Sequence, residues 1–433
     1  MADLLITGLA EVATPRGTAP RAGAEQGRVE RLPGAEVVCR DGRIAFVGSP
    51  QARRRELGDL PGAIRLDGQG GTLVPGFVDC HTHLPWAGSR ENEFAERLAG
   101  KTYLEIAAAG GGILSTVRAT RAAGEDELVE LTYDRLDRML AHGTTTAEVK
   151  SGYGLSRADE LKQLRAVRRA GDAHEVDVVP TLLAAHEFPP ERRDDRDGWV
   201  EEIAREIVPA VAAAGLARFC DVFCESVVFT VEQSRRVLEA GLEHGLVPRL
   251  HADEFADSGG AALAAELGAA SADHLVAVSP AGIEAMAAAG VMGVLLPGVS
   301  FFLMKEDYAP ARELIAAGVP VALATDCNPG SSHTESLPFI IQLAVFRMKM
   351  TIEECLTAVT LNPACCLGRG GEIGSVEAGK RADLTLLEGP SLLHLGYHLG
   401  VNPVRAVIKD GYVVWPVASP LPQSPVSSPP SRR

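Results

Sequence analysis

Residues 74–83 read Val-Pro-Gly-Phe-Val-Asp-Cys-His-Thr-His, an apolar, β-like run that ends in two histidines. Residues i and i+2 of a strand point to the same side, so His81 and His83 can converge on one metal ion. An isolated His-x-His pair is a weak signal of a metal site. The alternative, a pair of solvent-facing or structural histidines, therefore remains open at this point. The rest of the chain has to distinguish these two interpretations.

The run that contains this stretch is the first of eight apolar, β-like runs, and helical patterns separate them. In residues 128–140, apolar side chains recur with the 3.6-residue period of a helix. Alternating buried strands and helices predict a parallel sheet, and eight such strands predict a (β/α)8 TIM-like barrel of the α/β class. An open, doubly wound sheet is the alternative, which is weakened because no Gly-x-Gly-x-x-Gly fingerprint follows the first strand. The predicted strands are 72–80, 144–150, 176–184, 219–224, 246–250, 270–273, 291–296 and 319–325.

Polar residues gather where several of these predicted strands end. His251 follows the fifth strand, His274 follows the sixth and Asp326 follows the eighth. Active sites of parallel barrels lie at the carboxyl ends of the strands. We therefore expect these three side chains to lie close to His81 and His83.

The residue types in this set indicate a metal-dependent hydrolase. Three imidazoles (His81, His83 and His251) and the Asp326 carboxylate suit one Zn²⁺ or Fe²⁺/Fe³⁺ per chain and leave a position for water. A bound metal lowers the pKa of water from about 15.7 towards about 7. Asp326 is then expected to carry a proton as well as to bind metal, and His274 to orient the water or polarise the bond under attack. A second metal is not expected, because the fourth predicted strand ends without a bridging lysine.

Composition excludes several classes of protein. Of the 433 residues, 46% are hydrophobic and 23% are charged, which is typical of a globular chain. The net charge of −15 leaves no broad basic face for nucleic acid. No apolar run approaches the ~18 residues that span a bilayer, and residues 1–6 read as a strand rather than a secretion signal. The eight cysteines include no Cys-x-x-Cys pair and are expected to be buried thiols of a cytoplasmic protein.

Both ends of the chain carry short β-like pieces outside the predicted barrel. Asp-Gly pairs at 41–42 and 410–411 each separate two such pieces, and Asp-Gly favours the type I′ turn of a hairpin. Two small β regions at opposite ends suggest one composite β-sandwich domain. We expect its N-terminal part at 1–70, the barrel at 71–368, its C-terminal part at 369–415 and a disordered, Ser- and Pro-rich tail at 416–433.

The order of these residues along the strands resembles the amidohydrolase superfamily, in which the His-x-His motif is general. Three further segments are more specific and resemble the imidazolonepropionase family of histidine degradation. They are Ala-Gly-Ser-Arg-Glu-Asn-Glu-Phe at 87–94, Lys-Ser-Gly-Tyr-Gly-Leu at 150–155 and Ala-Thr-Asp-Cys-Asn-Pro-Gly-Ser-Ser at 324–332. The resemblance extends from about residue 72 to residue 415.

The resemblance implies hydrolysis of 4-imidazolone-5-propanoate, a cyclic amide, to N-formimidoyl-L-glutamate. It also implies that Arg90 grips the substrate carboxylate in bidentate fashion, which a lysine cannot do. Tyr153 and His186 would hold the ring, and Glu254 would either bind a ring nitrogen or take part catalytically by carrying a proton. Read without the family, each of these is an ion-paired, packing or capping residue. Three residues after strand eight would complete the carboxylate pocket: Asn328, Gly330 and Ser331. The alternative is that they form only a capped turn.

Two other functions are weighed against this one. A deaminase of cytosine or a related ring shares the single-metal geometry and the strand-six histidine, but its neutral substrate offers no anion to Arg90. A non-catalytic relative used for binding or assembly would usually lack a metal ligand, and all four expected ligands are present. The base rate among soluble oligomers and the family resemblance both indicate a homodimer, although no stretch identifies its interface.

Overall fold

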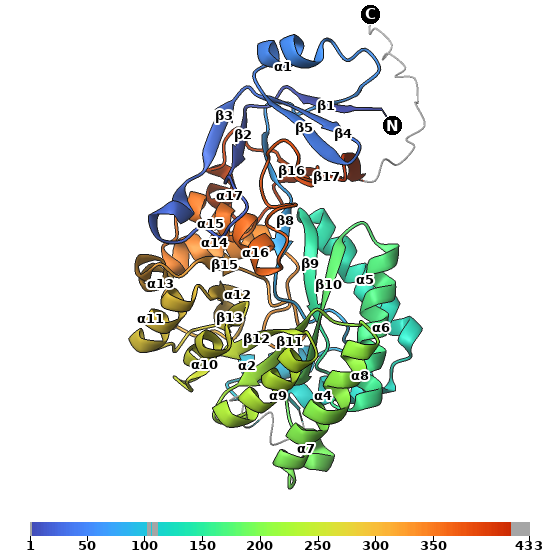
Figure 1. Ribbon diagram of the computed structural model, residues 1–433, viewed down its shortest axis with the longest axis vertical. Coiled ribbons are helices and arrows are strands. Elements are labelled where there is room, and N and C mark those ends of the chain that lie inside the picture. Colours follow the sequence, from blue (N-terminus) through green and yellow to red (C-terminus); the bar gives the residue numbers. More distant parts are fainter. Residues whose placement is uncertain (1, 102–104, 106–110, 417–433) are drawn as a thin grey trace, which may run out of the picture.

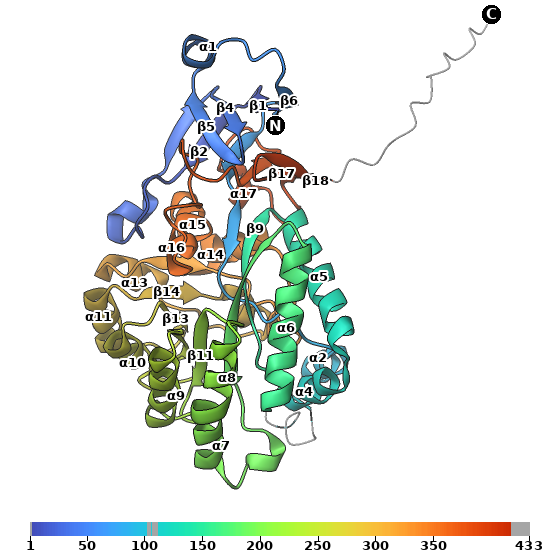
Figure 2. The same cartoon turned by 45° about the vertical axis from the view of Figure 1, so that its right-hand side comes forward.

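The computed structural model describes residues 2–101, 105 and 111–416, so nearly all of the tail predicted to be disordered lies outside the described residues. Eight strands form one parallel sheet in which each strand pairs with the next along the chain (Figures 1 and 2). This order confirms the predicted barrel. The strands are β8 (Phe77–Asp79), β9 (Thr144–Lys150), β10 (Asp177–Ala185), β11 (Phe219–Cys224), β12 (Val247–Ala252), β13 (Ser271–His274), β14 (Met292–Leu295) and β15 (Val321–Leu323).

The barrel closes through residues that lie just beyond its first and last strands. The Asp326 N–H donates to the His81 carbonyl at 3.0 Å, and the His83 N–H donates to the Cys327 carbonyl at 3.0 Å. These two bonds form a parallel bridge between Thr82 and Cys327. The His-x-His motif is therefore held by backbone bonds to the segment that carries the expected aspartate.

The prediction of one continuous strand over 72–80 is wrong. Residues Thr72–Pro75 form β7, which pairs with strands from both ends of the chain, and only Phe77–Asp79 (β8) belongs to the barrel. Gly76 lies at the break, where an added Cβ would fall 2.3 Å from the Thr145 hydroxyl. The apolar run continues through the break because both strands are fully buried, so hydrophobicity alone did not show it.

Helices follow most of the barrel strands and cover the outside of the barrel (Figure 2). Their ends match local capping signals: Thr230 and Gln233 form a reciprocal capping box at the start of α9, and Thr351 and Glu354 do so at α15. The helices of this region are α2 (Glu91–Leu98), α4 (Ile113–Ala122), α5 (Glu125–Ala141), α6 (Arg157–Ala173), α7 (Arg196–Glu202), α8 (Val208–Ala213), α9 (Val231–Glu243), α10 (Gly260–Leu267), α11 (Pro280–Ala289), α12 (Pro297–Phe302), α13 (Ala311–Ala317), α14 (Leu337–Met348), α15 (Ile352–Ala358) and α16 (Leu361–Cys366).

Strands from the two ends of the chain lie together at one end of the barrel, as the blue and red ribbons of Figure 1 show. They form a four-stranded sheet in the order β5-β4-β1-β6 and a six-stranded sheet in the order β18-β17-β16-β7-β2-β3. Both Asp-Gly turns occur as predicted, because Asp41, Gly42, Asp410 and Gly411 all have positive φ. The remaining elements are β1 (Leu4–Thr7), β2 (Glu11–Thr14), β3 (Glu30–Pro33), β4 (Glu36–Arg40), β5 (Arg43–Gly48), α1 (Pro50–Leu57), β6 (Ile64–Asp67), β16 (Leu384–Leu387), α17 (His394–Tyr397), β17 (Val404–Lys409) and β18 (Tyr412–Trp415).

The terminal sheets contact the amino ends of the barrel strands. The Thr385 hydroxyl donates to the Gly143 carbonyl, just before β9, and Lys409 pairs with Asp177, the first residue of β10. The carboxyl ends of the barrel strands therefore face away from these sheets. In the part of the chain that is described, no helix combines the length and the apolar character needed to cross a bilayer.

Candidate active site

The three histidines and the aspartate predicted to bind metal meet inside the carboxyl end of the barrel. His81 and His83 follow β8, His251 lies in β12 and Asp326 follows β15. The Nε2 atoms of His81 and His83 lie 3.4 and 3.2 Å from Oδ1 of Asp326, and the Nε2 atoms of His83 and His251 are 3.4 Å apart. All four residues are at most 3% exposed. Strand ends far apart in the sequence thus bring one set of donor atoms to one point.

The donor atoms fit a divalent transition metal. Nε2 of His81 and Oδ1 of Asp326 are buried and have no hydrogen-bond partner among the described residues. Leaving such atoms unsatisfied is costly unless another group binds them. Three imidazole nitrogens and a carboxylate oxygen are a donor set that Zn²⁺ and Fe²⁺ both accept.

Two carboxylates behind the histidines fix which ring nitrogen faces the cluster. His81 Nδ1 lies 2.6 Å from Oδ2 of Asp273, and His251 Nδ1 lies 3.1 Å from Oδ1 of Asp221. A proton on each Nδ1 satisfies its carboxylate and leaves Nε2 with a lone pair for metal. The sequence analysis assigned no role to either aspartate.

The histidines differ in their affinity for protons. Burial, with nearby positive charge from Lys150, holds the pKa of His81 well below its ordinary value, and burial does the same for His83. Burial also opposes the charged form of His251, but the Asp221 carboxylate outweighs this effect and raises the pKa of His251. A metal and a proton compete for Nε2 of His251, which makes metal affinity depend on pH.

His274 and Glu254 lie beside the cluster, as expected from the sequence. His274 Nδ1 is 3.6 Å from Oε2 of Glu254, and His274 also forms a possible ligand group with His81 and Asp326. Burial lowers the pKa of His274 to about 3 and raises the pKa of Glu254 to about 7. His274 and Asp326 have positive φ angles of 77° and 49°, a backbone conformation that is strained for residues other than glycine and is frequent at functional sites.

Rings from two other loops adjoin the cluster. The imidazole of His186 stacks on that of His83 at a centroid distance of 5.0 Å, and the Tyr153 ring lies 6.0 Å from the same histidine. Nδ1 of His186 is 3.0 Å from the carbonyl of Gly152, so a proton on Nδ1 leaves Nε2 as an acceptor. Burial keeps the pKa of His186 well below its ordinary value and hence favours this neutral form.

Arg90 is placed against the loop that follows β15. Its Nη1 atom lies only 1.9 Å from the position that a Cβ of Gly330 would occupy, so the guanidinium rests directly on this glycine. Its Nε donates to Glu93 at 2.8 Å. The structure thus brings together Arg90 and Gly330, two of the residues that the sequence analysis grouped in a carboxylate pocket.

The turn after β15 is held by its own asparagine. The side-chain oxygen of Asn328 accepts from the N–H groups of Gly330 and Ser331, each at 2.8 Å. These N–H groups are therefore bonded within the turn, which matches the capped-turn alternative for the backbone. The Asn328 amide donates to the carbonyl of Asp326 at 2.7 Å and thus links this turn to the cluster.

Four charged residues are fully buried beneath the cluster. Lys150 lies 2.8 Å from Oδ2 of Asp221, and Arg249 donates to Oδ2 of Asp273 at 3.0 Å. A lone acidic residue inside the apolar run at 219–224 was the available sequence signal for Asp221. Lys150 was expected to pair with an acid beneath the site as a structural residue, and Asp221 is such an acid. No local pattern could name Asp221 as the partner, because the two residues are on non-adjacent strands, β9 and β11.

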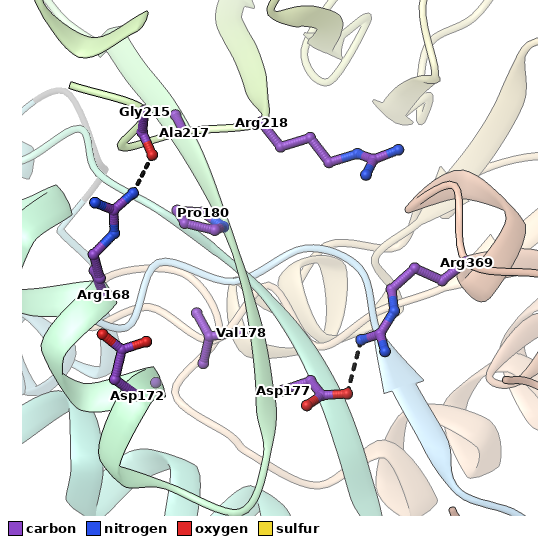
Figure 3. A pocket seen from close by; sticks show the side chains of 10 residues that line it. Arg168, Asp172, Asp177, Val178, Pro180, Gly215, Ala217, Arg218 and Arg369 are labelled. Atoms are coloured by element: carbon purple, nitrogen blue, oxygen red, sulfur yellow. Dashed lines mark hydrogen bonds and ion pairs between the residues drawn. The ribbon is translucent and has the colours of Figure 1, made fainter. Parts of the chain in front are cut away.

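A cavity of about 460 Å³ lies elsewhere on the barrel, and arginines line it (Figure 3). Arg168, Arg218 and Arg369 contribute guanidinium groups, and Arg369 binds Asp177 at 2.8 Å. Asp177 starts β10 and Arg218 immediately precedes β11. This cavity is therefore at the amino ends of the strands, opposite the histidine cluster, and is not the candidate active site.

Comparisons with known proteins identify a family and close relatives for this chain. A model of the amidohydrolase family matches residues 100–415. The imidazolonepropionase of Symbiobacterium thermophilum is 50% identical, with 95% of this chain and 97% of the relative covered. That of Shouchella clausii is 52% identical, with 96% and 93% covered.

Solved structures of other enzymes share the fold at low sequence identity. An adenosine deaminase from Xanthomonas campestris with bound zinc has a TM-score of 0.69 at 21% identity, covering 95% of this chain and 92% of that one. The guanine deaminase of E. coli has a TM-score of 0.71 at 15% identity, covering 96% and 99%. These likenesses show a shared fold alone.

Proposed function

The chain belongs to the imidazolonepropionase family of amidohydrolases, and from this premise we propose how its residues hydrolyse 4-imidazolone-5-propanoate to N-formimidoyl-L-glutamate. The observation that carries the mechanism is the convergence of three histidine Nε2 atoms and one Asp326 oxygen inside the barrel. These four residues would hold one metal. When bound there, Zn²⁺ or Fe²⁺ makes water acidic enough to attack a carbonyl at neutral pH and stabilises negative charge on the carbonyl oxygen.

Asp326 moves the proton in this proposal. Water adds to the carbonyl carbon of the imidazolone, Asp326 accepts the proton that this water loses, and the carbon–nitrogen bond of the ring then breaks. Asp326 returns the proton to the departing nitrogen. In the metal-free protein, burial raises the pKa of Asp326 above its ordinary value.

His274 and Glu254 flank the reacting carbonyl in this scheme. Burial keeps His274 neutral, so it donates a hydrogen bond to the carbonyl oxygen as negative charge develops there. Glu254 binds a ring nitrogen, and a part in proton transfer is compatible with its pKa of about 7.

Arg90, Tyr153 and His186 orient the substrate. The propanoate carboxylate is the only charged group of the substrate side chain, and the Arg90 guanidinium is the matching cation beside the loop of Asn328, Gly330 and Ser331. The acceptor at Nε2 of His186 suits a ring N–H, and the Tyr153 ring adjoins the same space. The contact at Arg90 is remote from the bond that breaks.

The first experiment combines metal analysis of the purified protein with an assay for N-formimidoyl-L-glutamate formed from fresh 4-imidazolone-5-propanoate. Cytosine and dihydroorotate serve as control substrates. We expect about one metal per chain and product from the imidazolone only. Metal without this product would contradict the proposed substrate, and absence of both would contradict the proposed reaction. The same analysis distinguishes zinc from iron.

We also propose that the protein acts as a homodimer in the cytoplasm. Two-fold pairs are the commonest soluble oligomers. The eight cysteines are all free thiols and seven of them are buried, which supports a reducing compartment. Sedimentation of the purified protein measures the oligomeric state, and a monomeric mass would overturn the first part.

A further inference from the structure

Behind the metal-binding histidine of β12 lies a continuous chain of contacts that ends in a buried lysine. His251 Nδ1 is 3.1 Å from Oδ1 of Asp221. The other oxygen of this carboxylate is 2.8 Å from Nζ of Lys150, and Nζ donates to Glu148 at 2.9 Å. The side chains of Lys150, Asp221 and Glu148 are completely buried.

Stability alone does not account for this charged group. Apolar residues usually fill the interior of a parallel barrel, and replacing a buried ion pair by apolar residues is often neutral or stabilising. Lys150 and its two carboxylates occupy such interior positions directly below the cluster. One carboxylate, Glu148, would be enough to pair the lysine, so the contact with Asp221 requires a further explanation.

The geometry supplies this explanation. The ammonium of Lys150 attracts one oxygen of Asp221, and this ion pair favours the carboxylate orientation in which the other oxygen is directed at His251 Nδ1. The imidazole is then fixed with Nε2 facing the cluster, 3.4 Å from Nε2 of His83. Partners of this kind behind a metal-binding histidine typically change metal affinity by about 10- to 100-fold.

A second histidine of the site is supported in the same way. His81 Nδ1 contacts Asp273, and Arg249 donates to the same carboxylate at 3.0 Å and to the Cys80 carbonyl at 2.7 Å. At two places in the barrel, a buried cation therefore lies behind a carboxylate that contacts a metal-binding histidine. Lys150 lies behind Asp221, and Arg249 lies behind Asp273. This repetition indicates that the cation is part of the site and not an isolated packing feature.

We propose that Lys150 is a positioning residue that acts through Asp221 to hold His251 in the orientation that binds metal. This inference rests on the proposed metal site. Lys150 touches neither substrate nor metal, and its effect on the reaction is indirect.

The test measures the dissociation constant for Zn²⁺ by competition with a chelating dye, together with the midpoint of urea unfolding, in the metal-free full-length protein. We expect K150M to weaken Zn²⁺ binding by about 10- to 100-fold. The matched control is K409M. Lys409 forms an equally short pair of 2.8 Å with Asp383 and is likewise buried, but it lies in the terminal sheets. K409M is expected to lower stability without changing Zn²⁺ affinity.

A double variant tests the route through Asp221. If Lys150 acts only through this carboxylate, D221N and K150M/D221N will bind Zn²⁺ equally within about twofold, because the second change has nothing left to act on. This comparison also serves if K150M alone does not fold. Tenfold weaker binding by the double variant than by D221N would overturn the inference.

Two further results distinguish this inference from the proposed function. The positioning role would be overturned if K150M bound Zn²⁺ with the affinity of the wild type. It would also be overturned if K409M lost as much Zn²⁺ affinity as K150M. Either result would leave the proposed metal site intact. Wild-type protein that binds no Zn²⁺ or other divalent metal would overturn the proposed function itself and the inference with it.

Discussion

Asp326 has two expected roles, metal binding and proton transfer. Replacing its carboxylate by the amide of asparagine allows the two roles to be measured separately. D326N keeps an oxygen near the three histidines but cannot accept the proton of the attacking water. We expect kcat to fall by about 10²- to 10⁴-fold while the metal content stays near that of the wild type. Steady-state kinetics with metal analysis of the same samples measures both. Unchanged turnover would remove Asp326 from proton transfer.

Arg90 is expected to bind the end of the substrate that does not react. R90A should raise KM by at least about tenfold and change kcat less, because the lost contact is present before and during the reaction. R90K should be intermediate, since a lysine binds a carboxylate without the bidentate geometry. R97A is the control, because Arg97 lies in α2, the helix that Arg90 directly precedes, and its guanidinium is 4.9 Å from the centroid of the Phe302 ring. An unchanged KM in R90A would place the carboxylate elsewhere.

Glu254 makes the stability of the metal-free protein depend on pH. Burial raises its pKa from 4.5 to about 7, so the folded protein accommodates the ionised form poorly. Its stabilising contribution is complete below about pH 4.5 and is lost as the pH rises through about 7. At about 1.4 kcal/mol per pKa unit, the loss is about 3.5 kcal/mol.

E254Q removes this titration. We expect its free energy of unfolding to match that of the wild type near pH 4.5 and to exceed it by up to about 3.5 kcal/mol above pH 8. Urea unfolding of both metal-free proteins across this range measures the difference. A difference that does not vary with pH would contradict the raised pKa.

At the scale of single elements, the loop after β15 controls the position of Arg90. A Cβ on Gly330 would meet Nη1 of Arg90, the far end of a flexible side chain, so the guanidinium has to move while the loop need not. We expect G330A to raise KM, but by less than R90A does, with little change in melting temperature. G371A is the control, because nothing lies within 4 Å of its added Cβ. A large loss of stability with unchanged KM would refute this account.

The sequence predicted elements well where the signal is local. The Asp-Gly turns were correct because the positive φ angles they require are a property of two adjacent residues. The run over 72–80 was misread because β7 and β8 are equally buried, and a hydrophobic pattern reports burial without naming the partner strand. Pairing depends on residues far away, here Val74 with Thr385 and Val78 with Thr146.

At the scale of the whole molecule, Asp177 joins the barrel to the terminal sheets. Its carboxylate lies 2.8 Å from Arg369, 2.7 Å from Arg381 and 3.1 Å from Lys409. Burial opposes ionisation, but these three cations outweigh it and lower the pKa of Asp177. Its contribution to stability is therefore present above its ordinary pKa of 3.8 and is lost as the pH falls below it.

D177N leaves the three cations without this carboxylate. We expect the free energy of unfolding at pH 7 to fall by about 2 kcal/mol, less than for a fully buried pair because the side chain is 28% exposed. The value of kcat/KM should not change, since Asp177 lies at the end of the barrel opposite the histidines. Urea denaturation of D177N and the wild type at pH 7 and pH 3 measures the difference in free energy of unfolding. The same difference at both pH values would contradict the lowered pKa of Asp177.

The strand-and-helix alternation, the barrel and the residue types at the strand ends could all be inferred from the amino-acid sequence alone. Each is encoded in a local pattern: burial and period in a short window, and a polar residue where an apolar run stops. The family resemblance added the reaction, because segments around Arg90, Tyr153 and Asn328 are specific to it.

How these residues meet became visible in the three-dimensional structure. The hydrogen bonds of His81 and His83 to the segment after β15 close the barrel, and the carboxylates of Asp221 and Asp273 orient the histidines. These contacts join residues tens to hundreds of positions apart. A local pattern states that a side chain is buried, but the path of the whole chain decides which side chain it is buried against.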